Sequence, residues 1–217
     1  MNVHLTSLAV LMMGATFYGC AGSGPSAPGA PAVPPASASV SAPKAPSTSK
    51  GVAVAIPVAN GGFENSGEDR PGRNCPPQWW CTMHSDPTSF RFASVAGGPS
   101  GRFLRGERVK NEPWALVTQT IPAKGLDGRI LRVTSDVNTS QLKAGDGAGA
   151  GPIIRIYGPG GRVVAAEKSL RPVGAPWARA SVELAVPSGA ELIDIGVVMY
   201  GDGVADFDNV VAEHRPK

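Results

Sequence analysis

One short loop holds the side chains best suited to chemistry. Cys75 and Cys81 enclose the sequence Pro-Pro-Gln-Trp-Trp, and they are the only cysteines after residue 50. Two thiols at this spacing can form a disulfide or supply part of a zinc site, which needs four ligands. His84 is the only further zinc ligand nearby, so a disulfide is the better interpretation. Indole rings held in such a loop would offer flat apolar surfaces to a ligand.

The two adjacent tryptophans of this loop are the main binding candidates. On an extended segment their side chains point to opposite faces, so we expect one to be buried and the other exposed. Trp114 follows Pro113 at the start of a predicted strand and could be either a core or a binding residue. The alternative is that the loop tryptophans form a hydrophobic plug at one end of the fold. The candidate ligand-binding residues are Trp79, Trp80, Gln78, His84 and Trp114.

The sequence predicts no catalytic site. His84 and His214 are the only histidines after residue 50, and neither belongs to a recognisable nucleophile or metal-binding motif. Two pairs of carboxylates lie close in sequence and are interpreted as turn or surface residues, namely Asp206 with Asp208 and Glu68 with Asp69. We therefore expect a protein that is not an enzyme.

β-Strands are the elements expected to position these side chains. Residues 178–187 alternate between apolar and polar types, which predicts a strand with one buried face. Trp177 precedes this strand and is assigned to the core. Residues 192–200 are apolar almost throughout, as in a central strand, so Tyr200 is expected to be structural. The other predicted strands are residues 52–58, 89–95, 102–109, 115–121, 129–137, 152–157, 162–166 and 204–212.

Glycine and proline punctuate these strands. The chain has 28 Gly and 21 Pro among 217 residues, a content that excludes a helix-rich bundle. Residues 158–161, Gly-Pro-Gly-Gly, predict a hairpin turn. The glycine-rich residues 145–151 predict a flexible loop and not a phosphate cradle, because no Lys-Ser/Thr follows. The predicted fold is an all-β sandwich of about ten short antiparallel strands.

Composition and charge exclude other classes of protein. The formal net charge is +3, from 20 Lys and Arg against 17 Asp and Glu, and no basic stripe is present. A nucleic-acid partner is therefore not expected. The apolar share of 42% is too high for a wholly disordered chain, so at least one folded domain is present.

The first 50 residues resemble an export signal and a tether. Residues 1–19 contain an apolar stretch with the length of a signal-peptide core, and Gly19-Cys20 resembles the end of a bacterial lipobox, whose Cys is lipidated. Residues 20–50 are rich in Pro, Ala and Ser, which predicts a disordered linker. Residues 51–217 then form the folded domain. We expect a lipoprotein exported to the cell envelope and held in the outer membrane by its N-terminal lipid; the alternative is an exported protein cleaved nearby without lipid.

Motifs at both ends of the predicted domain resemble a known family. The domain opens with Asn-Gly-Gly-Phe-Glu at residues 60–64 and closes with Phe-Asp-Asn-Val at residues 207–210. This pattern resembles the jelly-roll carbohydrate-binding modules of the galactose-binding-like type. The resemblance implies a jelly-roll β-sandwich that binds a glycan or another cell-envelope polymer. The alternative is a structural or protein-interaction domain that has no small-molecule ligand.

The same resemblance implies a metal. In many such modules a structural calcium joins the opening Glu to the closing Asp, which are Glu64 and Asp208 in this sequence. Carboxylate and carbonyl oxygens are the ligands that calcium prefers. The alternative is that both carboxylates accept backbone hydrogen bonds where the first and last strands meet.

Overall fold

The computed structural model describes residues 51–66 and 75–217. All the strands described belong to one compact unit, which spans Ser47–Lys217. The predicted signal peptide, Cys20, the whole predicted linker and the Glu68–Asp69 pair lie outside the described residues. The predictions that rest on those segments therefore stay predictions.

The described strands form two antiparallel sheets. Sheet A has the strand order β3-β4-β11-β6-β9, with β1 paired to β11, and sheet B has the order β2-β5-β10-β7-β8. Sheet A consists of β1 (Val54–Ile56), β3 (Phe90–Ala96), β4 (Arg102–Arg108), β6 (Ile130–Asn138), β9 (Ala178–Ala185) and β11 (Val204–Arg215). Sheet B consists of β2 (Trp80–Met83), β5 (Trp114–Pro122), β7 (Gly149–Tyr157), β8 (Val163–Lys168) and β10 (Leu192–Tyr200).

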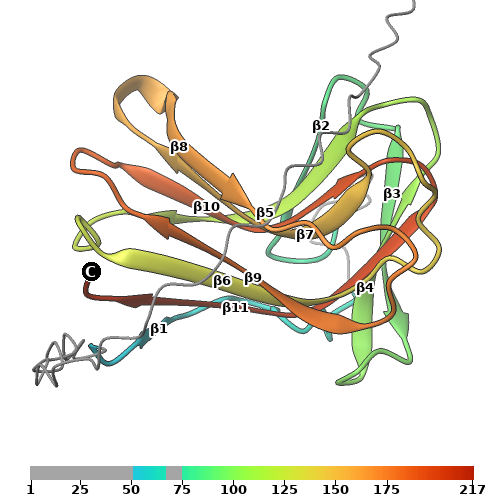
Figure 1. The fold of residues 1–217 in the computed structure, drawn as a ribbon, viewed down its shortest axis with the longest axis horizontal. Coiled ribbons are helices and arrows are strands. Elements are labelled where there is room, and N and C mark those ends of the chain that lie inside the picture. The colour runs from blue at the N-terminus through green and yellow to red at the C-terminus, as the bar shows by residue number, and fades with distance from the viewer. Residues whose placement is uncertain (1–50, 67–74) are drawn as a thin grey trace, which may run out of the picture. The chain divides into compact units, whose positions relative to one another are not determined.

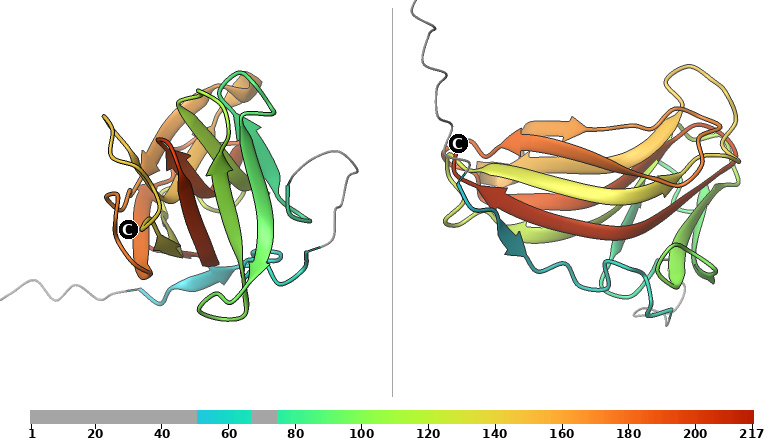
Figure 2. Two further views of the ribbon diagram at one scale, coloured as in Figure 1. Left: turned by 90° about the vertical axis from the view of Figure 1, so that its right-hand side faces the viewer. Right: turned by 60° about the horizontal axis from the view of Figure 1, so that its bottom comes forward.

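The two sheets face each other as the layers of a jelly-roll sandwich, which confirms the predicted fold class. Figure 1 shows β5, β10, β7 and β8 in the upper layer and β6, β9 and β11 in the lower one. Figure 2 shows the layers from two further directions, with β1 beside the C-terminal end of β11. One side of each sheet therefore faces the core, and the other side faces outward.

Alternating side chains fill the space between the sheets. In β10, Ile193, Ile195, Val197 and Met199 point into the core, and each is at most 1% exposed. Full burial of each such side chain is worth about 1.5–3 kcal/mol. The residues between them in β10 consequently point away from the core, onto the outer face of sheet B.

Helical structure is nearly absent from the described part of the chain. A 3-10 turn at Pro159–Gly161 joins β7 to β8, at the position of the predicted hairpin turn. Within residues 51–66 and 75–217, no helix has the length and apolar character needed to cross a membrane.

The predicted strands agree with the structure except at two places. Strand β2 is absent from the prediction, because four residues are too few to show alternation. The prediction of a flexible loop over residues 145–151 is wrong for its last three residues. Gly149–Gly151 begin strand β7 and pair with β10, so these glycines belong to the sheet.

The opening and closing motifs of the domain meet in space. The Val210 backbone N–H donates a hydrogen bond of 2.9 Å to the Gly61 carbonyl. A Cβ at Gly61 would collide with the Val210 carbonyl oxygen, so only glycine permits this approach. The next turn puts Phe63, fully buried, at a left-handed φ of 55°. Such strain persists only where the surrounding packing enforces it.

The prediction that Trp177 lies in the core is wrong. Its half-buried ring packs edge to face against Phe103, with 5.6 Å between the ring centroids. Phe103 precedes Leu104, whose side chain lies in the core, so Phe103 and Trp177 meet on the outer side of sheet A. Trp177 precedes the first residue of β9 and does not follow the alternation of that strand.

Candidate functional site

The outer face of sheet B carries a second apolar cluster. A surface of this kind on an antiparallel sheet is ordinarily polar. Here three side chains from β5, β7 and β10 are at most 6% exposed although they point away from the core, and three partly buried side chains pack against them. A covered apolar cluster on a solvent-facing side marks a candidate binding surface. The buried residues are Leu116, Ile153 and Val198, and the covering residues are Trp114, Leu170 and Tyr200.

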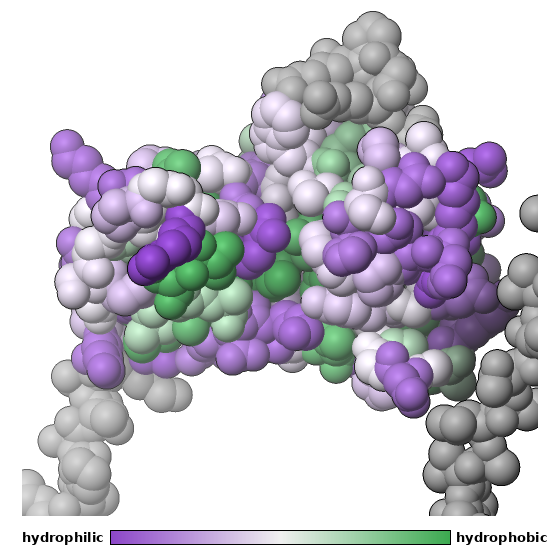
Figure 3. All heavy atoms as spheres, turned by 90° about the horizontal axis from the view of Figure 1, so that it is seen from above, coloured by the Kyte–Doolittle hydropathy of each residue, from purple (hydrophilic) through white to green (hydrophobic). Residues whose placement is uncertain are grey.

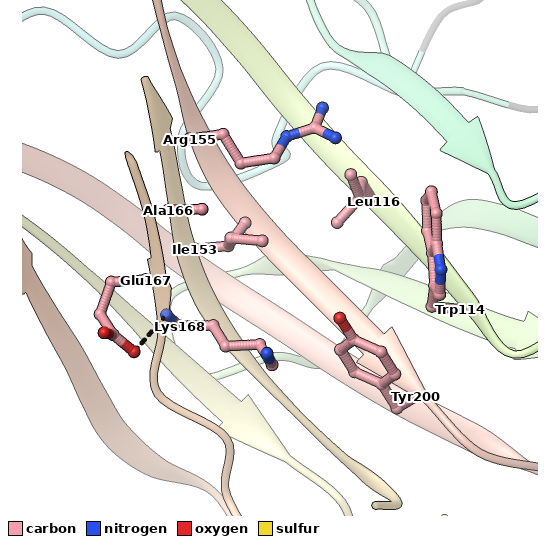
Figure 4. A pocket seen from close by; sticks show the side chains of 8 residues that line it. All are labelled: Trp114, Leu116, Ile153, Arg155, Ala166, Glu167, Lys168 and Tyr200. Atoms are coloured by element: carbon pink, nitrogen blue, oxygen red, sulfur yellow. Dashed lines mark hydrogen bonds between the residues drawn. The ribbon is translucent and has the colours of Figure 1, made fainter. Parts of the chain in front are cut away.

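A pocket of about 280 Å³ opens on this cluster. Pockets for small molecules commonly measure ~300–1,000 Å³, so this one suits a short segment of a ligand. Figure 3 views this side of the sandwich and shows hydrophobic side chains near the centre, between hydrophilic ones. Figure 4 shows the residues that line the pocket, which are Trp114, Leu116, Ile153, Arg155, Ala166, Glu167, Lys168 and Tyr200.

Two aromatic rings form one wall of the pocket. Trp114 and Tyr200 are direct partners across the β5–β10 ladder, so strand pairing brings them together. Neither the Trp114 Nε1 nor the Tyr200 hydroxyl donates a hydrogen bond to a described residue. Figure 4 shows the Tyr200 hydroxyl pointing into the pocket. The wall therefore combines apolar ring surface with two polar groups that are available to a ligand.

His84 supports the Trp114 ring from outside the pocket. The two rings meet edge to face, with 5.6 Å between their centroids. His84 Nδ1 lies 3.1 Å from Glu112 Oε2, which holds the imidazole beside the indole. His84 thus fixes the position of Trp114 and does not line the pocket.

A glycine leaves the middle of this outer face without a side chain. Gly196 lies in β10 between Asp194 and Val198, which point outward, so a side chain here would cover the sheet. A Cβ at Gly196 would collide with the Val117 carbonyl oxygen of β5. The close approach of the two strands therefore requires glycine, and it leaves the centre of the outer face without a side chain.

A buried polar network borders the pocket. The Asp194 carboxylate, 9% exposed, accepts hydrogen bonds of 2.7 Å from Thr120 Oγ1, Arg155 Nη2 and the Tyr157 hydroxyl. Burial and the adjacent Asp194 carboxylate raise the pKa of Tyr157 to about 12. Three hydrogen bonds to one buried carboxylate make this network rigid, although the buried Arg155 Nε has no hydrogen-bond partner among the described residues. It holds Arg155 at the pocket and neutralises its charge.

The Cys75–Cys81 disulfide is present and orders the loop that enters β2. The two Cα atoms lie 5.7 Å apart. As expected, the adjacent tryptophans point to opposite sides. Trp79 is 6% exposed, and its ring packs in the core against Phe63 with 5.2 Å between centroids. Trp80 is 46% exposed.

Removing this disulfide is expected to destabilise the domain. In the chain-entropy model a cross-link that closes so short a loop is worth about 2–3 kcal/mol. The double substitution Cys75→Ala and Cys81→Ala should lower the free energy of unfolding by that amount in urea denaturation without reductant. Reductant should destabilise the wild-type chain and leave the double variant unchanged. Equal stability of the two chains without reductant would contradict this expectation.

The structure places the five candidate ligand-binding residues in different parts of the domain. Trp114 lines the pocket and His84 packs against it. Trp80 lies on the same outer face, because its partner in the ladder is Thr118, two residues after Leu116. Trp79 belongs to the core and is not a binding residue. Gln78 is exposed in the turn before β2, with a left-handed φ of 69°, and does not line the pocket.

Glu64 and Asp208 both hold the loop before β4. Glu64 Oε1 accepts a hydrogen bond of 3.0 Å from the Arg102 backbone N–H. Asp208 Oδ2 accepts from the Ser100 hydroxyl at 2.9 Å, and burial raises the pKa of Asp208. These contacts match the hydrogen-bonding alternative. No group of three or more His, Cys, Asp or Glu within the described ranges is placed to hold a metal ion. Calcium binding stays a prediction.

The interpretation of Asp206 and Asp208 as turn or surface residues is wrong. Both lie buried in strand β11, at 3% and 0% exposure. Asp206 accepts two hydrogen bonds from Arg105, at 2.8 and 3.1 Å. These carboxylates therefore stabilise the outer side of sheet A.

Most residues that line the pocket are absent from the sequence-based predictions. Tyr200 is predicted to be structural, yet it forms a pocket wall, and Arg155 and Lys168 are absent from the candidate list. A signal was present in residues 153–157, where the polar side chains of Arg155 and Tyr157 alternate with Ile154 and Ile156. That pattern shows that one face of the strand carries polar groups, but not which strands lie beside it.

Comparison with known proteins identifies the fold. No family model matches the chain, and no curated protein matches it. The enzymatically active domain of bacteriophage CBA120 tailspike protein 4 has a TM-score of 0.54 and 18% identity over 71% of this chain, which spans 21% of the tailspike chain. A Bacteroides thetaiotaomicron protein whose name assigns it to sugar binding has a TM-score of 0.51 and 10% identity, covering 74% of this chain and 99% of its own.

A third similar structure is the CBM22-1 xylan-binding domain from Paenibacillus barcinonensis. Its TM-score is 0.49 and its identity 12%, with 77% of this chain and 97% of that domain covered. At such identities the two matches with scores above 0.5 establish a shared β-sandwich fold, and function must be argued from the site.

Proposed function

We propose that the domain binds carbohydrate, without catalysis, in the pocket on the outer face of sheet B. The observation that carries the proposal is the pair Trp114 and Tyr200, whose rings stand over a buried apolar cluster with their polar groups unused by described residues. Sugar rings present C–H faces that stack on aromatic rings, and hydroxyls that need hydrogen-bond partners. The name of the similar Bacteroides thetaiotaomicron protein supports this proposal.

One row of residues offers a path for a longer glycan. Successive ladder partners place these residues side by side across all five strands of sheet B, a width of about 19 Å at ~4.8 Å per strand spacing. The row begins at the exposed Trp80 and crosses the centre of the face at Gly196, where no side chain projects. It consists of Trp80, Thr118, Gly196, Ile153 and Lys168. A chain of several sugars could thus contact Trp80 at one edge and fill the pocket with its other end.

A glycan array with the purified chain tests this proposal. We expect selective binding to a subset of glycans, which titration calorimetry then measures. Substitutions of the pocket aromatics Trp114 and Tyr200 should weaken that binding. If no glycan or envelope polymer binds, the structural or protein-interaction alternative replaces this function.

We further propose that the domain belongs to an envelope lipoprotein. The support is the sequence alone, in which Gly19-Cys20 follows an apolar stretch and precedes the Pro/Ala/Ser-rich residues 21–50. A tether of this composition would let the domain reach polymers away from the membrane surface.

Replacing the lipidated residue is expected to release the protein from membranes. The Cys20→Ala substitution removes the thiol that would carry the acyl chains, and two or more chains are needed for stable anchoring. The wild-type protein should fractionate with membranes and the variant should not. Mass spectrometry of the N-terminus provides the second readout. An unmodified N-terminus elsewhere in the wild-type protein would overturn the proposal.

A further inference from the structure

Lys168 brings an unpaired positive charge to the pocket. It lies in β8 as the ladder partner of Ile153, on the outer face of sheet B. Its Nζ is 5.4 Å from the centre of the Tyr200 ring, and Figure 4 shows the two side chains facing each other. Lys168 forms no ion pair with any residue in the described ranges, and its side chain is exposed.

The carboxylates near the pocket do not neutralise this charge. Asp194 is paired with Arg155 Nη2 at 2.7 Å, so these two charges cancel. Glu167 precedes Lys168, and neighbouring residues of a strand point to opposite faces. The Glu167 carboxylate accepts a hydrogen bond of 3.0 Å from the Lys168 backbone N–H, which Figure 4 draws as a dashed line. The Lys168 ammonium therefore lies beside the aromatic wall with no described carboxylate paired to it.

We infer that the ligand is an acidic glycan, whose anionic oxygen group is bound by Lys168 while its sugar ring stacks on Trp114 or Tyr200. This inference rests on the proposed function and specifies its ligand class. Ligand binding removes the Lys168 ammonium group from water, which costs free energy. An anionic group of the ligand reduces that cost because it forms a charge-assisted hydrogen bond with the ammonium. A neutral sugar would leave the ammonium with weaker hydroxyl acceptors.

The shared chemistry is an anionic oxygen group, which a uronate carboxylate or a sugar sulfate can supply. The test therefore uses two matched pairs of polymers. One pair is a polyuronate and the same polymer after carboxyl reduction, and the other is a sulfated polysaccharide and its desulfated form. Affinity is measured for the full chain in detergent, at low salt and at about 1 M NaCl, where the Debye length falls to about 3 Å.

We expect the wild-type chain to bind at least one acidic polymer about tenfold more tightly than its neutral counterpart at low salt. That preference should shrink at high salt. The K168Q variant should lose the preference, because its affinity for the acidic polymer should fall to its affinity for the neutral counterpart. The control is K124Q, which removes the same charge from an exposed loop residue outside the pocket and should behave as wild type.

The outcomes distinguish this inference from the proposed function. Equal affinity for the acidic and neutral members of both pairs would overturn the inference and leave carbohydrate binding standing. A preference that persists in K168Q would also overturn it. Failure of the wild-type chain to bind any of the four polymers or any glycan on the array would overturn both.

Discussion

Replacing Trp114 by Ala is expected to weaken glycan binding by about 30-fold or more, which corresponds to ~2 kcal/mol. The indole forms the pocket wall together with Tyr200, and its loss removes both the stacking surface and the free Nε1 donor. Trp114 is half-buried on the outer side of sheet B and is not part of the main core, so the fold should persist. Titration calorimetry measures the affinity, and circular dichroism melting checks the fold.

Two further variants make this test specific. Tyr200→Phe keeps the ring and removes only the hydroxyl, so it should weaken binding by about fivefold, the effect of one lost hydrogen bond. Trp177→Ala removes an indole of similar exposure from the outer side of sheet A, and glycan affinity should be unchanged. If Trp114→Ala binds the glycan as tightly as wild type, the pocket is not the binding site.

The Trp79→Ala substitution is expected to destabilise the domain by about 3–5 kcal/mol. Trp79 is 6% exposed and packs against Phe63, so its removal leaves a cavity in the core. Its Nε1 also donates a hydrogen bond of 3.1 Å to the Asn60 carbonyl, in the turn that carries the opening motif. Urea denaturation of the purified chain measures the loss.

The neighbouring Trp80→Ala substitution is the matched control. Trp80 is 46% exposed, and truncating an exposed side chain changes stability by about 0.5 kcal/mol or less. Trp80→Ala should instead weaken binding of glycans long enough to extend from the pocket to β2. Equal destabilisation by the two substitutions would mean that the assignment of Trp79 to the core and Trp80 to the surface is wrong.

Most of the strands, the turn at residues 158–161 and the disulfide could be predicted from the sequence. Alternation in residues 178–187 predicts which side of β9 is buried, because side chains of a strand point to opposite faces in turn. The structure confirms this, with Val182 and Val186 at 4% and 2% exposure. The Cys75–Cys81 bridge follows equally from local spacing, and so does the opposite placement of Trp79 and Trp80.

The position of the pocket depends on strand pairing, which the sequence pattern does not predict. Trp114 and Tyr200 are far apart in sequence, and they meet because β5 pairs with β10 in one register. Lys168 joins them only because β8 pairs with β7 at the edge of the same sheet. Periodicity assigns each side chain to one of two faces but carries no information on strand order, which depends on non-local pairing. For the same reason, local pattern placed Trp177 in the core, whereas its contact with Phe103 lies on the outer side of sheet A.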